Sequence, residues 1–237
     1  MRTIAIAVML FFTSGMIYGQ CRSTATISPS RRVLFFAVKQ RNLIDALLSF
    51  GGQEHIPIGI EYIDKTAFQE HISAEFRERN VKEILDAITH PLGYRWFTNG
   101  PVVLVTHDGA LVGKSNLLNT RIPHFRIGET SMHEASLALS LHLYFALNPN
   151  SGGIAGDSPG GNLAFRVGPF DLKNATVRDT LNQIVSQHSN GAWIVQQPAW
   201  TMGKDLGYGL WKVLEYDRTD AEYSRELEVR GLGLQAR

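Results

Sequence analysis

The chain has 237 residues, of which 44% are hydrophobic and 19% are charged, and its formal net charge is +1. Because positive and negative charges balance, the composition gives no electrostatic reason to expect nucleic acid or an acidic polymer as a ligand. The length allows one large domain or two small ones. A single cysteine is present, so no intramolecular disulfide can form and the fold must rest on packing.

The first twenty residues are typical of a secretory signal peptide. Arg2 supplies a positive charge, residues 4–12 form an apolar core, and small residues including Gly19 follow it. The apolar run is shorter than the roughly 20 residues that span a bilayer. We therefore expect residues 1–20 to direct export, which places the protein in the periplasm or at the outer membrane of a bacterium.

Cys21 follows this segment and is a candidate for lipidation. The sequence YGQC at residues 18–21 resembles a bacterial lipoprotein box, although its tyrosine and glutamine replace the usual aliphatic and small residues. The alternative is a free thiol near the cleavage site. Residues 21–32 are polar and lack periodicity, which predicts a tether. Contact with a membrane is expected only through the N-terminal lipid.

One pattern occurs twice in the rest of the chain. Residues 81–88 and 177–185 each place apolar side chains on one helical stripe, and each follows an alternating run that is typical of a strand. A glycine and an aromatic strand come after each helix, with Trp96 and Trp193 at nearly the same spacing; we interpret both as core residues. The repetition predicts an α+β fold of two tandem βαββαβ-type units, with helices packed on short sheets.

The first unit is expected over residues 33–107. Its predicted elements are a strand at 33–39, a helix that Asn42 caps and Gly51-Gly52 ends, strands at 56–62 and 72–76, the helix at 81–88, and strands at 94–97 and 101–105. Asn99-Gly100 predicts a tight hairpin between the last two strands. The order is therefore β-α-β-β-α-β-β.

Four segments of the first unit carry a family resemblance. They are VKQRNLIDAL at residues 38–47, the Ile-Pro-Ile strand at 56–58, the strand at 72–76 that leads into VKEILDAI at 81–88, and LGYRW at 92–96. Together they resemble the secretin and TonB short N-terminal domain, called STN, over about residues 33–106. The resemblance implies helices between small sheets and a role as a periplasmic docking or signalling module. STN domains normally precede an outer-membrane barrel or a secretin core, and neither is recognised after residue 106.

The second unit is expected over residues 121–199, after a linker at 108–120. A strand at 125–127 leads into a helix that Thr130 or Ser131 opens and Glu134 caps, running to about residue 147. The pattern places Leu137, Leu141, Tyr144 and Phe145 on one face of this helix. A Gly-rich loop at 149–161, a strand at 163–172, the second repeated helix and a strand at 192–195 follow. Residues 200–237 are interpreted as one more strand, at 211–216, and a tail.

Motifs for catalysis, metals and cofactors find little support. Residues 109–115 resemble a phosphate loop but have three residues between the glycines where four are needed, so a linker is favoured. None of the eight histidines pairs at i, i+2 or i, i+4, which argues against a metal site. We predict no catalytic residue, metal or cofactor. The alternative is an exported serine hydrolase, in which Ser158 within GDSPG at 156–160 acts as the nucleophile.

These observations favour a non-catalytic docking module that binds another envelope protein. Small sheets leave edge strands whose unpaired N–H and C=O groups a partner strand can extend. The strands at 102–105 and 211–216 are the candidates, because each comes late in its unit. The candidate partner-binding residues are Val102, Val103, Val105, Trp200, Tyr208 and Trp211.

Overall fold

The computed structural model describes residues 27–62, 66–110, 116–147, 166–196 and 212–215. The fold is α+β, with short sheets and helices in small units, as predicted. The first unit contains β1 (Arg32–Arg41), α1 (Leu43–Glu54), β2 (Ile58–Tyr62), α2 (Thr66–Gln69), β3 (Ile72–Asn80), α3 (Val81–Thr89), the 3-10 turn η1 (His90–Leu92), β4 (Tyr94–Asn99) and β5 (Val102–His107). The predicted order and the Asn99-Gly100 hairpin are confirmed.

The second unit has a similar order of elements, with an additional strand, β7, that precedes the first helix and pairs with β8. A 3-10 turn, η3 (Leu117–Asn119), leads into β6 (Arg121–Ile127), β7 (Thr130–Ser131), α4 (Met132–Leu147), β8 (Arg166–Val167), β9 (Phe170–Thr176), α5 (Val177–Val185), β10 (Gly191–Gln196) and β11 (Lys212–Glu215). β6 pairs with β9 as β1 pairs with β3, and β10 pairs with β11 as β4 pairs with β5. Thus α3 corresponds to α5, and β4 corresponds to β10.

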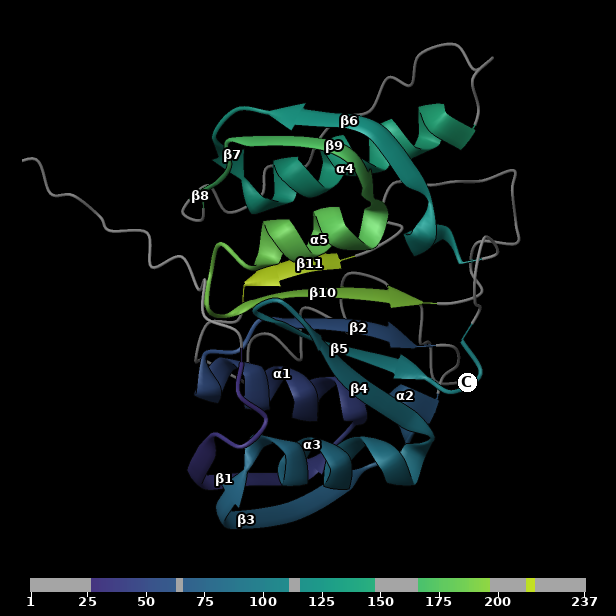
Figure 1. Cartoon of the computed structure of the whole chain (residues 1–237). Helices are drawn as coiled ribbons and strands as arrows, with labels where there is room; N and C mark the ends of the chain where they lie inside the picture. The colour runs from purple at the N-terminus through teal and green to yellow at the C-terminus, as the bar shows by residue number, and fades with distance from the viewer. Residues whose placement is uncertain (1–26, 63–65, 111–115, 148–165, 197–211, 216–237) are drawn as a thin grey trace, which may run out of the picture.

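The two units share one central sheet with the strand order β11-β10-β2-β5-β4. β2 runs parallel to both β5 and β10, whereas β4 and β11 are antiparallel to their neighbours. Figure 1 shows five layers: the β1–β3 ribbon, α1 with α3, the central sheet, α5 with α4, and the β6–β9 ribbon. The second unit therefore joins the first through a direct strand pair.

Each face of the central sheet has its own apolar core. One core lies between the sheet and α1, α3 and the β1–β3 ribbon, and it includes Ala192 and Ile194 from the second unit. The other core lies under α4 and α5 and includes Val102 and Leu104 from the first unit. The residues predicted to form the helical stripes are fully buried or nearly so, namely Val81, Leu85, Ile88, Val177, Leu181 and Ile184.

The entry into the repeated helices is alike in both units. Asn80 and Thr176 are the N-caps, and each forms a capping box with the acidic residue three positions later, Glu83 or Asp179. The residue two positions before each cap has a positive φ of 52°, which is uncommon for a side chain other than glycine. The same backbone kink therefore turns each strand into its helix.

Three predicted details of the elements are wrong. Gly51 and Gly52 lie inside α1, which ends at Glu54 and is followed by His55 in the left-handed region. Position 51 requires glycine because a Cβ would lie 2.8 Å from the carbonyl oxygen of Ile56. The strand predicted at 163–172 is interrupted by Gly168-Pro169, which separates β8 from β9.

The third error concerns the buried face of α4. Met132, Ala135, Leu139 and Leu143 are buried, whereas the predicted face at residues 137, 141, 144 and 145 is only partly covered, and Phe145 is exposed. The helix carries leucines on most of its circumference, so the pattern alone does not decide which stripe packs.

The first turn of α4 predicts an acid-sensitive contribution to stability. Glu134 accepts hydrogen bonds from Thr130 Oγ1 and from Ser131 N and Oγ, both at 3.0 Å, and these bonds lower its pKa to about 2. A carboxylate with a lowered pKa stabilises the fold above its unfolded pKa of about 4.3 and loses this effect as the pH falls towards 2. We expect Glu134→Gln to flatten the dependence of Tm on pH between 5 and 2. An unchanged dependence would contradict the role given to this cap.

Candidate partner-binding edge

The structure places the predicted docking strand of the first unit inside the sheet. β5 is bonded to β2 on one side and to β4 on the other, and Val102, Val103 and Val105 are completely buried. No backbone group of β5 is therefore available to a further strand, and the prediction that residues 102–105 form an edge is wrong. The physical reason is that β2 pairs with β5 in parallel across the unit.

Other predicted candidates lie outside the described residues. These are the lipidation candidate Cys21, the alternative nucleophile Ser158, and the aromatic residues Trp200, Tyr208 and Trp211. The described part of the strand predicted at 211–216 is β11, which has only β10 as a neighbour among the described strands.

β4 forms the other edge of the central sheet. The amide of Asp108 donates to the carbonyl of Gly93 at 2.9 Å, so this pair is a hydrogen-bonded pair of the ladder. Bonded and non-bonded pairs alternate in an antiparallel ladder, and the backbone groups of Trp96 and Thr98 therefore point away from β5. Among the strands that the structure describes, none pairs with β4 on this side.

The side chain of Trp96 packs from this edge towards α3. Its indole Nε1 donates to Asp86 Oδ1 at 2.7 Å, and the half-buried ring contacts the first core. Lys82 forms an ion pair with the same carboxylate, yet 62% of the Lys82 side chain remains exposed. Partial burial acts to raise the pKa of Asp86, but the bonds from Lys82 and Trp96 and the nearby charges outweigh it and leave the pKa lowered.

In the second unit, β10 is the strand equivalent to β4. The edge of β10 that faces away from β11 is paired with β2, whereas the corresponding edge of β4 has no described neighbour. Trp193 donates from Nε1 to Asn182 Oδ1 at 2.8 Å, which repeats the bond between Trp96 and Asp86, but Trp193 is completely buried. It lies directly opposite Gly59 of β2. A Cβ on Gly59 would approach the indole to 2.3 Å, so only glycine leaves room for this ring.

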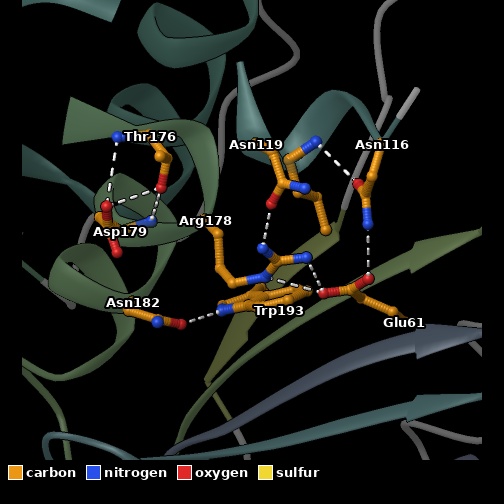
Figure 2. A network of polar contacts seen from close by, with 9 residues as sticks. Glu61, Asn116, Asn119, Thr176, Arg178, Asp179, Asn182 and Trp193 are labelled. Carbon is orange, nitrogen blue, oxygen red and sulfur yellow. Dashed lines mark hydrogen bonds and ion pairs between the residues drawn. The ribbon is translucent and has the colours of Figure 1, made fainter. Parts of the chain in front are cut away.

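A polar network lies beside the pair of strands β2 and β10, which joins the two units and is called the joint below. Glu61 of β2 is almost completely buried and accepts hydrogen bonds on Oε1 from Arg178 Nε at 2.9 Å and from Arg178 Nη2 at 2.6 Å. Asn119 accepts from Arg178 Nη1, and Asn116 donates from Nδ2 to Glu61 Oε2 at 3.2 Å (Figure 2). The linker prediction for residues 108–120 missed this role, since these asparagines connect the two units.

No metal site or membrane-spanning helix is found in the part of the chain that the structure describes. No three His, Cys, Asp or Glu residues there are grouped so that they could hold a metal ion. No described helix is both long and apolar enough to cross a membrane. Two of the histidines instead form single contacts, His124 Nε2 with Asp171 at 2.8 Å and His55 Nδ1 with Asn190 at 3.0 Å.

Comparisons with known proteins give no relative. No protein-family model, curated protein or solved structure matches the chain.

Sequence reasoning missed the residues that form the joint, namely Gly59, Glu61, Asn116, Asn119 and Arg178. A signal for one of them was present in the repeat. Arg178 occupies the second position of α5, as Lys82 occupies the second position of α3. Aligning the repeats residue by residue identifies Lys82 and Arg178 as equivalent residues. The partner of Arg178, Glu61, can be identified only once the strand order is known.

Proposed function

We propose that the protein is a non-catalytic docking module of the bacterial cell envelope, which binds another envelope protein by accepting a strand at β4. The observation that carries the proposal is the open edge of β4, which pairs with no other described strand and where the backbone groups of Trp96 and Thr98 point away from β5. An exposed edge of this kind is a template for strand addition, in which main-chain hydrogen bonds supply affinity.

Two further features support this proposal. The first unit resembles STN domains, which serve as docking or signalling modules, and its helices lie between a two-stranded ribbon and a sheet, as that resemblance implies. The exposed ring of Phe97 on β4 adds apolar surface beside the open edge. Export of the chain, expected from residues 1–20, would bring this edge to envelope partners.

Crosslinking in intact cells tests the proposal. A photo-crosslinking residue at Thr98 should capture an envelope protein, which mass spectrometry identifies, whereas the same residue at exposed Lys173 on the distant β6–β9 ribbon should not. Equal products at both positions, or none at Thr98, would rule out docking at β4.

A proline variant separates strand addition from other contacts. With the crosslinker placed at exposed Phe97, Thr98→Pro should remove most of the product, because it deletes an outward N–H while the β4–β5 ladder stays bonded. The folded state is checked by near-ultraviolet circular dichroism. A folded Thr98→Pro protein that still crosslinks fully would contradict strand addition.

A further inference from the structure

The pairing of β2 with β10 inside the protein indicates what kind of strand the open edge of β4 binds. β4 and β10 are equivalent strands that run in opposite directions in the sheet, because β4 is antiparallel to β5 while β10 is parallel to β2 and so to β5. The helices of the two units cover opposite faces of the sheet. A half-turn about an axis along the hydrogen-bonding direction of the sheet, together with a shift along that axis, therefore relates the units.

The same operation, applied to β2, which is the partner of β10, places an equivalent strand on the open side of β4. In the joint, β10 pairs in parallel with β2, with Trp193 opposite Gly59. Trp96 occupies the place of Trp193 in the first unit, and each indole donates to the residue at the same position of its helix, Asp86 or Asn182. The two indoles differ in burial. Trp193 has β2 as its neighbouring strand, whereas Trp96 has no described strand on the equivalent side and remains half-buried.

The charged residue of the joint also has an equivalent at the open edge. Arg178, at the second position of α5, binds Glu61, which lies two residues after Gly59 on β2. Lys82 is at the second position of α3 and keeps most of its side chain exposed. An acidic residue opposite Thr98, the equivalent of Val195, would lie where Glu61 lies in the joint and face this ammonium group.

We propose that β4 binds, in parallel, an apolar strand of another protein that carries a glycine opposite Trp96 and an acidic residue two positions later facing Lys82. This inference rests on the docking function proposed above and specifies its partner. A second copy of the chain cannot supply its own β2, because both edges of that strand are paired with β5 and β10. The glycine admits the indole, and the acid fixes the register.

A peptide with the β2 sequence, residues 56–62 (IPIGIEY), is the probe. Titrated into isotopically labelled protein, it should shift the NMR signals of the Trp96 indole and the Thr98 amide. A Gly59→Val peptide should bind at least about tenfold more weakly, because the added side chain meets the indole. Equal affinity of the two peptides, or shifts confined to β11, would overturn the inference.

Charge and direction are tested separately. A Glu61→Lys peptide should bind several-fold more weakly, roughly as expected for a partly exposed pair, and Lys82→Glu in the protein should restore its binding. A spin label on the C-terminus of the peptide should broaden the amide of Asn99 more than that of Tyr94, since the strands are parallel. Failure of the restoration, or the opposite broadening, would contradict the proposed partner.

The outcomes distinguish this inference from the docking function itself. If Thr98 crosslinks an envelope protein in cells but the peptides bind without preference for glycine, docking at β4 stands and the partner strand has another chemistry. If the cell experiment fails while the peptides discriminate as described, the edge has the inferred specificity and the envelope role is wrong.

Discussion

Replacing Arg178 by alanine should destabilise the protein by about 3–5 kcal/mol, the range for breaking a buried ion pair by removing one partner. The reason is that Glu61, whose side chain is only 4% exposed, loses both bonds from the guanidinium and the cation that faces it in the joint. Only the bond from Asn116 would remain among those to the Glu61 carboxylate described above. Urea unfolding at neutral pH measures this loss.

The repeat supplies a matched control for this substitution. Lys82→Ala removes the cation at the equivalent helix position, but its partner Asp86 stays bonded to Trp96, and the Lys82 side chain is largely exposed. Exposed pairs contribute about 0–1 kcal/mol, so the expected loss is small. Equal losses for Arg178→Ala and Lys82→Ala would show that Glu61 does not depend on the guanidinium.

Local patterns predicted most of the elements of this fold. The stripes at 81–88 and 177–185, the caps Asn42 and Ser131, and the Asn99-Gly100 hairpin all depend on residues close together in the chain, and each is confirmed. Capping and turn formation are satisfied by neighbouring backbone groups, so they can be inferred without knowledge of the sheet.

The strand order could not be inferred in the same way. β2 meets β10 because Gly59 leaves space for Trp193 and because Glu61 meets Arg178, which is 117 residues away in the chain. Neither glycine nor glutamate on a short apolar strand indicates a partner so distant. The prediction of two tandem units therefore did not anticipate that they share a sheet.

The error at β5 had a warning in the sequence. Residues 102–105 are apolar without alternation, and such a run is typical of a strand that is buried on both faces in the interior of a sheet. β4, by contrast, has exposed residues at alternate positions, Arg95, Phe97 and Asn99. Greater weight on this contrast would have placed β4 at the edge, and with it the candidate site.

Replacing Gly59 by valine should cost roughly 3 kcal/mol or more, at the upper end of overpacking effects. A Cβ at this position lies 2.3 Å from the indole of Trp193 and 2.7 Å from Leu104, and both side chains are buried in the second core. Neither can move without breaking other contacts. Because the clash lies between β2 and β10, hydrogen exchange should accelerate most at the amides of β10.

Two controls identify the clash as the cause. Gly128→Ala adds a methyl group at an exposed position with no atom within 4 Å, and it should change stability by less than about 0.5 kcal/mol. Trp193→Leu is itself destabilising, but combined with Gly59→Val it should cost less than the sum, with a coupling of about 1 kcal/mol or more, because the smaller side chain leaves room for the added one. Strict additivity would mean that Gly59 is not required to admit the Trp193 ring, and it would remove the basis for expecting a glycine opposite Trp96 in the partner strand.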